Sequence, residues 1–237
     1  MRGALIACSW AAMLAAAAAL VAAPAQAARP MVTDDARIAD AGACQLETWV
    51  QNNRASTEYW ALPACNFTGN LELTLGGALT RQAGQTRTTD AVMQGKTVLR
   101  PLETNGWGLA LAAGTNHRPL ANGGSRNWYV NAPVSFSLRD DAVMLHANLG
   151  WLRDGEIRRD RLTWGLGAEA RLAERAWLIA ETFGQNRGKP SYQFGLRRWL
   201  IVDRVQIDAT YGNPYGTDTR ARWFSIGLRL LSPPFLR

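Results

Sequence analysis

The sequence predicts an all-β protein, a transmembrane antiparallel up-and-down β-barrel of about twelve strands. Three observations lead to this fold class. Short runs such as 71–75, 143–151 and 205–211 alternate between polar and apolar residues, which is the period of strands with two different faces. The N-terminus resembles an export signal, and most tryptophans fall near the ends of the alternating runs. Barrels of bacterial outer membranes combine all three features.

The first residues have the three parts of a cleaved signal peptide. Arg2 gives a positive start, residues 5–23 form an alanine-rich apolar stretch, and Ala25-Gln26-Ala27 matches a small-residue cleavage site. A transmembrane helix is the alternative interpretation, but alanine is only weakly apolar and the cleavage site is well placed. We therefore expect residues 1–27 to be a signal peptide that directs export.

Beyond the signal, the chain divides into a short lead-in and a barrel. Residues 28–43 have no hydrophobic period, so we expect a flexible periplasmic N-terminal segment ahead of an outer-membrane β-barrel at residues 44–237. The alternating pattern predicts twelve strands in six hairpins. Their predicted ranges are 44–51, 56–64, 69–81, 90–99, 106–115, 127–138, 141–152, 161–170, 176–186, 190–199, 204–212 and 221–231.

The connections between these runs alternate in length. One set is short, as at Arg139-Asp140, whereas the other is mostly longer and rich in Arg, Asn and Gly, as at 116–126 and 153–160. Outer-membrane barrels have short periplasmic turns and longer external loops. With an even number of strands, both termini would then lie on the periplasmic side of a Gram-negative outer membrane.

Two cysteines remain after the signal, and both fall at the periplasmic end of the first predicted hairpin. Cys44 would open the first strand and Cys65 would close the second, so we expect a disulfide between them. Closing a loop of about twenty residues stabilises a fold by roughly 3 kcal/mol. No His lies near these cysteines, and the sequence contains no phosphate-binding loop, so it predicts neither a metal nor a cofactor.

Alternation also predicts which side chains face the interior. Enclosed charges must pair or meet water, so these residues either fill the barrel with ion pairs or line a polar, acid-biased pore. The sequence leaves both alternatives open. The predicted lumen-lining residues are Glu47, Glu58, Glu72, Gln94, Lys96, His146, Glu169, Glu181, Arg197, Asp208 and Arg229.

Tryptophans near strand ends predict an aromatic girdle. Indole favours the boundary between membrane and water because it is apolar and carries one donor. The alternative is the core of a soluble β-sandwich, which would place tryptophan at strand centres. The predicted girdle consists of Trp107, Trp128, Trp151, Trp177, Trp199 and Trp223.

The chain is basic, with a formal net charge of +7, and the excess lies in the predicted external loops. A cationic rim suits the phosphates of lipopolysaccharide, which arginine can bind with two hydrogen bonds. Nucleic acid is not an expected partner, because the chain carries an export signal and no basic helix. The external basic set is Arg54, Arg81, Arg87, Arg118, Arg126, Arg153, Arg158, Arg159, Arg161, Arg187, Lys189, Arg220 and Arg222.

One histidine could belong to a hydrolytic site. His146 lies in mid-strand and faces inward by the alternation, with Ser135 and Ser137 on the preceding strand and Glu169 on the next. A nucleophile, a base and an orienting acid would need to meet there. A lone interior histidine is more often a hydrogen-bonded structural residue, so we predict no catalytic residues.

Three short motifs carry a resemblance to a known family. Gln94-Gly95-Lys96-Thr97, the segment from Glu58 to Cys65, and the closing run from Trp223 to Leu230 resemble proteobacterial outer-membrane barrels of the phenol-degradation (meta-pathway) barrel and transporter family. The resemblance implies passage of small, often aromatic or apolar, compounds. Barrels of this kind end on an aromatic residue that the insertion machinery recognises, whereas here Phe235 lies two residues before the end.

The sequence thus predicts a passive outer-membrane channel for small molecules. Its expected partners are outer-membrane lipid, lipopolysaccharide, the barrel-insertion machinery and a small-molecule solute. One alternative is a plugged structural barrel that binds lipopolysaccharide through its basic loops. A lipid-modifying enzyme that uses His146 is the less favoured alternative.

Overall fold

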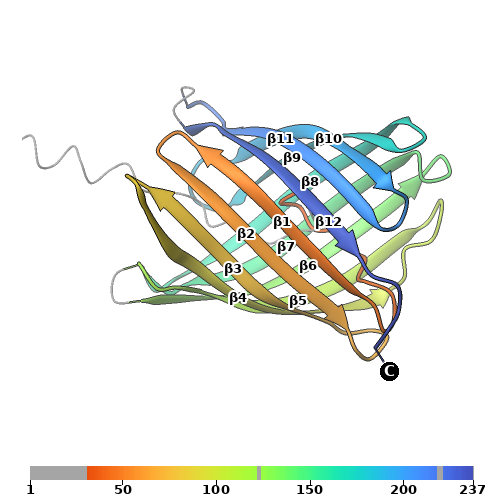
Figure 1. Ribbon diagram of the computed structural model, residues 1–237, viewed down its shortest axis with the longest axis horizontal. Coiled ribbons are helices and arrows are strands. Elements are labelled where there is room, and N and C mark those ends of the chain that lie inside the picture. The colour runs from red at the N-terminus through yellow and green to blue at the C-terminus, as the bar shows by residue number, and fades with distance from the viewer. Residues whose placement is uncertain (1–30, 122–123, 218–220, 237) are drawn as a thin grey trace, which may run out of the picture.

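The computed structural model describes residues 31–121, 124–217 and 221–236, and these form one closed antiparallel barrel of twelve strands (Figure 1). The strands follow one another around the barrel in chain order, and β1 pairs with β12 to close it. This confirms the predicted fold class. No helix within the described residues is long and apolar enough to cross a membrane. The expected signal peptide at 1–27 and Arg220 lie outside the described residues.

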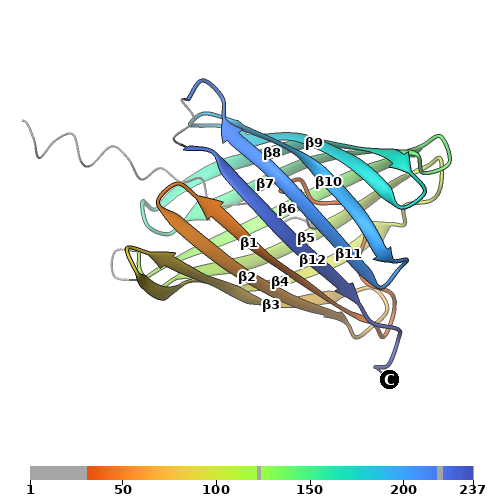
Figure 2. The same ribbon diagram turned by 45° about the horizontal axis from the view of Figure 1, so that its top comes forward.

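The strands are tilted across the barrel, and the C-terminus lies at the end where β1 begins and β12 finishes (Figure 2). We call this the terminal end and the opposite one the distal end. The strands are β1 (Cys44–Asn53), β2 (Ser56–Asn66), β3 (Glu72–Gln82), β4 (Gln85–Arg100), β5 (Trp107–Arg118), β6 (Ser125–Leu138), β7 (Val143–Asp154), β8 (Arg159–Ala173), β9 (Ala176–Gln185), β10 (Ser191–Ile201), β11 (Val205–Pro214) and β12 (Trp223–Leu231).

The hairpin of β3 and β4 is longer than the sequence predicts. A loop was expected at 82–89, but the strands meet at a tight turn in which Ala83 and Gly84 have positive φ angles of 49° and 79°. Residues 81–88 are exposed. This part of the hairpin therefore has no buried face, so polar and apolar residues need not alternate and the sequence pattern does not mark it.

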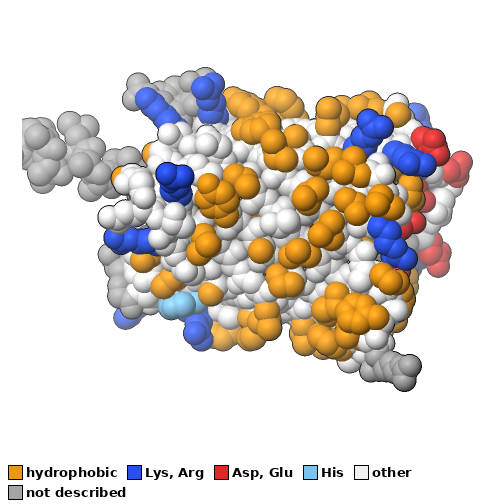
Figure 3. Space-filling model, in the orientation of Figure 1, with side chains coloured by type: hydrophobic (Ala, Val, Ile, Leu, Met, Phe, Trp, Pro, Cys, Tyr) orange, Lys and Arg blue, Asp and Glu red, His pale blue; other side chains and the backbone are white. Residues whose placement is uncertain are grey.

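The outer face of the barrel is apolar. Leu75 and Leu149, for example, expose 60% and 64% of their surface, as expected only where lipid replaces water. In Figure 3, hydrophobic side chains cover the middle of the visible wall and charged side chains gather toward its two ends. A soluble barrel has these faces reversed. The described barrel therefore has the faces of a membrane barrel.

Three of the six tryptophans of the predicted aromatic girdle lie on the inner face of the barrel and not on the lipid-facing side. Trp107, Trp128 and Trp151 point outward and are exposed. The other three, Trp177, Trp199 and Trp223, lie on the inner face. Trp177 and Trp223 each stand two residues from a buried residue of the same strand, and Trp199 pairs with the buried Gln206 of β11. Nearness to a strand end fixes the height of a side chain along the barrel. The face depends on strand phase, which the girdle prediction did not use.

The lead-in also differs from expectation. Residues 31–43 fold back from β1 into the barrel, where Met31, Ala36 and Ala39 are buried, instead of forming a flexible periplasmic segment. Its partners are side chains far along the chain, and the bond from Val32 to Glu181 spans 149 residues. A segment that is held by distant side chains has no hydrophobic period of its own, so the sequence gives no sign of its position.

Cross-links close the terminal end. Cys44 and Cys65 face each other in the register of β1 and β2 and form the expected disulfide. The tail beyond β12 pairs with the start of β1, because the Phe235 and Leu236 amides both donate to the Gly42 carbonyl. Gly42 has a φ of 73°, and a Cβ there would lie 2.8 Å from the Leu236 oxygen. Residues 31–43, called the inner segment below, are thereby held where they join β1 by the disulfide on one side and by the C-terminal tail on the other.

Replacing both Cys44 and Cys65 by serine should lower the free energy of unfolding by about 2–4 kcal/mol, because the unfolded chain regains the entropy of the closed loop. The midpoint of thermal unfolding in detergent, followed by circular dichroism, measures this change. Wild-type protein treated with a reductant should shift in the same direction. An unchanged midpoint in both samples would contradict the prediction.

Candidate functional site

The inner wall of the barrel holds the polar residues that the sequence assigned to it. Each of them has the inner phase of its strand. Three are half-buried, namely Glu58, Arg197 and Arg229. The others are buried, namely Glu47, Glu72, Gln94, Lys96, His146, Glu169, Glu181 and Asp208.

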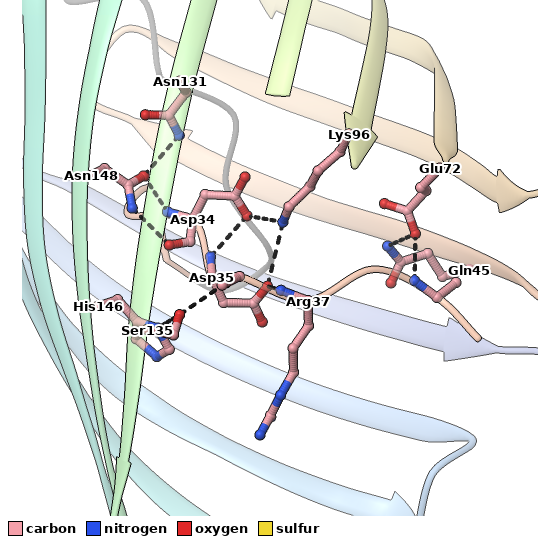
Figure 4. Close-up of polar contacts among 12 residues, drawn as sticks. Asp34, Asp35, Arg37, Gln45, Glu72, Lys96, Asn131, Ser135, His146 and Asn148 are labelled. Carbon is pink, nitrogen blue, oxygen red and sulfur yellow. Dashed lines mark hydrogen bonds and ion pairs between the residues drawn. The ribbon is translucent and has the colours of Figure 1, made fainter. Parts of the chain in front are cut away.

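Side chains of the inner wall bind the main chain at the start of the inner segment, which lies deepest in the barrel. The Glu181 carboxylate on β9 accepts hydrogen bonds from the amides of Val32 (2.7 Å) and Thr33 (2.6 Å). Asn148 on β7 makes a paired contact with Asp34, because its Oδ1 accepts from the Asp34 amide and its Nδ2 donates to the Asp34 carbonyl, both at 2.8 Å (Figure 4). Two wall side chains thus bind the main chain of three successive residues.

Further contacts follow the segment toward the terminal end. Ser135 Oγ on β6 accepts from the Ala36 amide at 2.9 Å. The Ala39 amide donates to Glu72 Oε2 on β3, and Asn66 Nδ2 donates to the Ala39 carbonyl, both at 2.8 Å. The segment is therefore bound on opposite sides of the lumen by polar side chains, without a regular β-ladder.

Two ion pairs of one buried lysine add selectivity for the side chains of the segment. Lys96 Nζ on β4 lies 2.7 Å from Asp34 Oδ1 and 3.4 Å from Asp35 Oδ1, with 4% of its side chain exposed (Figure 4). Burial favours the neutral form of Asp35, but the charges of Lys96 and Arg229 outweigh it and hold the pKa of this carboxyl below its usual value. Removing one partner of a buried pair commonly costs about 3–5 kcal/mol.

Two glycines on β8 make room for the segment. A Cβ added at Gly165 would lie 2.6 Å from Thr33 Oγ1, and one added at Gly167 would lie 2.0 Å from the Met31 methyl group. A cavity of about 30 Å³, enough to hold water, is left beside Val32 and Thr33. The wall and the segment therefore fit closely at this level.

Sequence reasoning overlooked why the wall is rich in acids. Among the ion pairs of the described residues none involves Glu181, which accepts from two segment amides and from Gln193 Nε2. Glu72 likewise accepts from the Ala39 amide and from Gln45 Nε2. The acid excess thus provides acceptors for N–H groups of the segment. An inward carboxylate without a matching base was the one signal that could have indicated a bound main chain.

The structure brings together the histidine set that the sequence proposed. His146 Nδ1 lies 2.8 Å from Ser135 Oγ, and its Nε2 lies 3.2 Å from Glu169 Oε1. Glu169 also pairs with Arg197. Ser137 does not join this chain, because its hydroxyl donates to Asp141 and accepts from the Asn105 amide.

Burial argues against catalysis by the hydrogen-bonded set of Ser135, His146 and Glu169. Ser135 has no exposed surface, and its Oγ already accepts from the Ala36 amide of the segment. It also faces the lumen, whereas bilayer lipids lie on the other side of the wall. The contacts brace β6, β7, β8 and β10 against one another. The described residues contain no group of three or more His, Cys, Asp or Glu side chains placed to hold a metal.

Aromatic side chains also line the lumen. Trp49 and Trp60 stack with ring centroids 5.1 Å apart, and Phe183 contacts Trp223 at 6.3 Å. The Trp223 indole donates to Gln193 Oε1 at 3.2 Å. Since β12 begins at Trp223, this contact lies toward the distal end. The lumen therefore combines a polar wall with two aromatic pairs.

Comparisons with known proteins agree with the fold. A family model described as uncharacterised conserved protein UCP029691 matches residues 14–231, and no curated protein matches the chain. A KdgM porin in complex with disordered oligogalacturonate has a TM-score of 0.59 at 9% identity, covering 78% of this chain and 98% of that one. A NanC porin has a TM-score of 0.56 at 10% identity, covering 79% and 98%.

At these identities the two porins show the fold alone, that of Gram-negative outer-membrane barrels, and the barrel described above fits that location. The matches do not show membership in the phenol-degradation family. That resemblance therefore stays a prediction.

Replacing Gly165 by alanine should displace the inner segment, because the new methyl group would overlap the stiff Thr33 side chain. An Ala36→Cys reporter, buried while the segment is docked, should then react several-fold faster with a water-soluble maleimide. The control is Gly95→Ala, where a Cβ meets its nearest neighbours at 3.6 Å. Equal labelling rates in the two variants would show that the glycine cradle does not hold the segment.

Proposed function

The chain belongs to the uncharacterised conserved family UCP029691, and we propose that it is an outer-membrane channel for small solutes in which residues 31–39 set the width of the lumen. One observation carries the proposal. Within the described residues, a single stretch of chain lies inside the barrel, and hydrogen bonds and the two ion pairs of Lys96 hold it to a polar wall.

Polar attachment distinguishes this occupant from a packed core. An apolar core is held by burial, and its release would expose hydrophobic surface to water. The groups that bind the segment exchange protein partners for water at a net cost of about 0.5–1.5 kcal/mol per hydrogen bond. A segment held in this way can leave, and the wall that it uncovers is hydrophilic. Such a wall suits an aqueous path.

The aromatic pairs support a preference for aromatic or apolar solutes. Trp49 with Trp60 and Phe183 with Trp223 place ring systems on the inner wall. Aromatic surfaces give apolar contact to small molecules, while nearby polar groups such as Gln193 fix their orientation. Small phenolic compounds combine both properties.

Replacing Lys96 by methionine should raise single-channel conductance several-fold, because the loss of the ion pair leaves Asp34 and Asp35 without their buried counter-charge and releases the segment. The measurement uses the full chain in planar bilayers, together with phenol uptake by liposomes. The β-ladders do not involve the Lys96 side chain, so the barrel should still fold.

The chain offers a matched control. Lys189 is its other lysine, is exposed, and donates to the Gly216 carbonyl near the distal end. Its replacement by methionine removes the same charge outside the lumen and should leave conductance unchanged. Absence of conductance and of uptake from wild-type and Lys96→Met protein, both inserted in the bilayer, would sink the channel hypothesis.

A structural barrel that binds lipopolysaccharide is the second candidate, favoured by the occupied lumen and by the exposed arginines at the distal end. Replacing Arg158, Arg159 and Arg187 by glutamine should then weaken the outer-membrane barrier, measured as uptake of a hydrophobic dye by cells, while Lys96→Met should not. If these arginine replacements leave dye uptake unchanged, this candidate loses its support.

A further inference from the structure

We propose that the inner wall formed by Ser135, Asn148 and Glu181 is a binding site for acidic peptides in a bent conformation, and that residues 31–39 are its tethered occupant. The inference rests on the proposed function in one respect, since a free peptide would reach the site through the lumen. The lumen would then bind acidic peptides in addition to small solutes.

The wall recognises main-chain groups, which every peptide has. Glu181 accepts from two successive amides, those of Val32 and Thr33, and Ser135 accepts from the Ala36 amide. These contacts do not depend on the side chains of the segment. A different sequence whose main chain bends in the same way would offer the same donors at the same spacing.

The contact of Asn148 favours a peptide over a sugar. Its side-chain amide pairs with both the N–H and the C=O of Asp34, each at 2.8 Å. A carboxamide that donates and accepts at once matches the donor and acceptor of one peptide residue. Asn131 Nδ2 also donates to Asn148 Oδ1 and fixes the orientation of this side chain.

Space and charge define the accepted side chains. Gly165 and Gly167 leave room on β8 for one polar side chain and one apolar side chain, filled here by Thr33 and Met31. Lys96 is buried and faces Asp34 and Asp35, so the site selects an acidic pair next to that position. A short acidic peptide of about six residues meets these requirements.

When the segment leaves, the polar groups of the site need new partners. Glu181 and Ser135 are buried beneath the segment, and they would lose their amide donors if the segment left. Glu181 would keep only the Gln193 donor of its three, and a buried carboxylate that loses donors is costly, so an emptied site favours water or another peptide. The tether at Cys44 gives the resident segment an effective concentration on the order of millimolar, which a free peptide must overcome.

The experiment uses the full-length chain with residues 31–39 replaced by glycine and serine, so that the site is empty but the barrel is complete. The probe is a fluorescent peptide with the sequence of residues 31–41, MVTDDARIADA. Fluorescence anisotropy should show saturable binding to this variant and at least tenfold weaker binding to wild-type protein. Binding should also weaken at least tenfold with Lys96→Met, but not with Lys189→Met.

A second probe, with asparagine in place of the aspartates that correspond to Asp34 and Asp35, tests the charge selection and should bind at least tenfold more weakly. Anisotropy unchanged by the peptide in a folded, emptied barrel would overturn the inference, and so would equal binding of both peptides. Conductance of the same variant separates the two proposals. Conduction without peptide binding rejects only the peptide site, whereas peptide binding without conduction rejects only the channel.

Discussion

The pairing of β1 with β12 is the constraint on which the rest of this structure depends. It closes the sheet, removes both edges, and gives every strand an inner and an outer face. Alternating side chains then enclose many polar groups in one lumen, where each must pair or meet water. The tail contact at Gly42 holds the same closure, and the disulfide ties β1 to β2, so the chain before β1 must start at the lumen entrance.

The inner segment resolves the polar excess created by this enclosure. Its amides supply donors to Glu181 and Glu72, and its aspartates supply the counter-charge of Lys96. The segment therefore joins the wall of β6 to β9 with the facing wall of β3 and β4. Glycines at 165 and 167 allow the close approach that these short hydrogen bonds require. Wall and segment form one network, so displacement of the segment changes the chemistry of the whole lumen.

The hydrogen bonds that link Ser135, His146 and Glu169 illustrate why geometry alone does not establish a reaction. The order of donors and acceptors is one that an acyl-transfer enzyme could use. Here the serine hydroxyl is covered by the Ala36 amide, and Arg197 engages the acid. The same contacts that would orient a nucleophile instead hold neighbouring strands and the segment together. Access to the serine oxygen decides between the two roles.

Sequence alone determined the barrel, its twelve strands, the polar inner wall and the positions of Cys44 and Cys65, because period-two alternation and the spacing of turns are local properties of the chain. It also suggested Ser135 and Glu169 as partners of His146, since neighbouring strands share a register. Only the tertiary structure decided where residues 31–43 lie and which tryptophans face the lumen. The segment has no period, and its partners are distant in sequence and become neighbours only when the sheet closes.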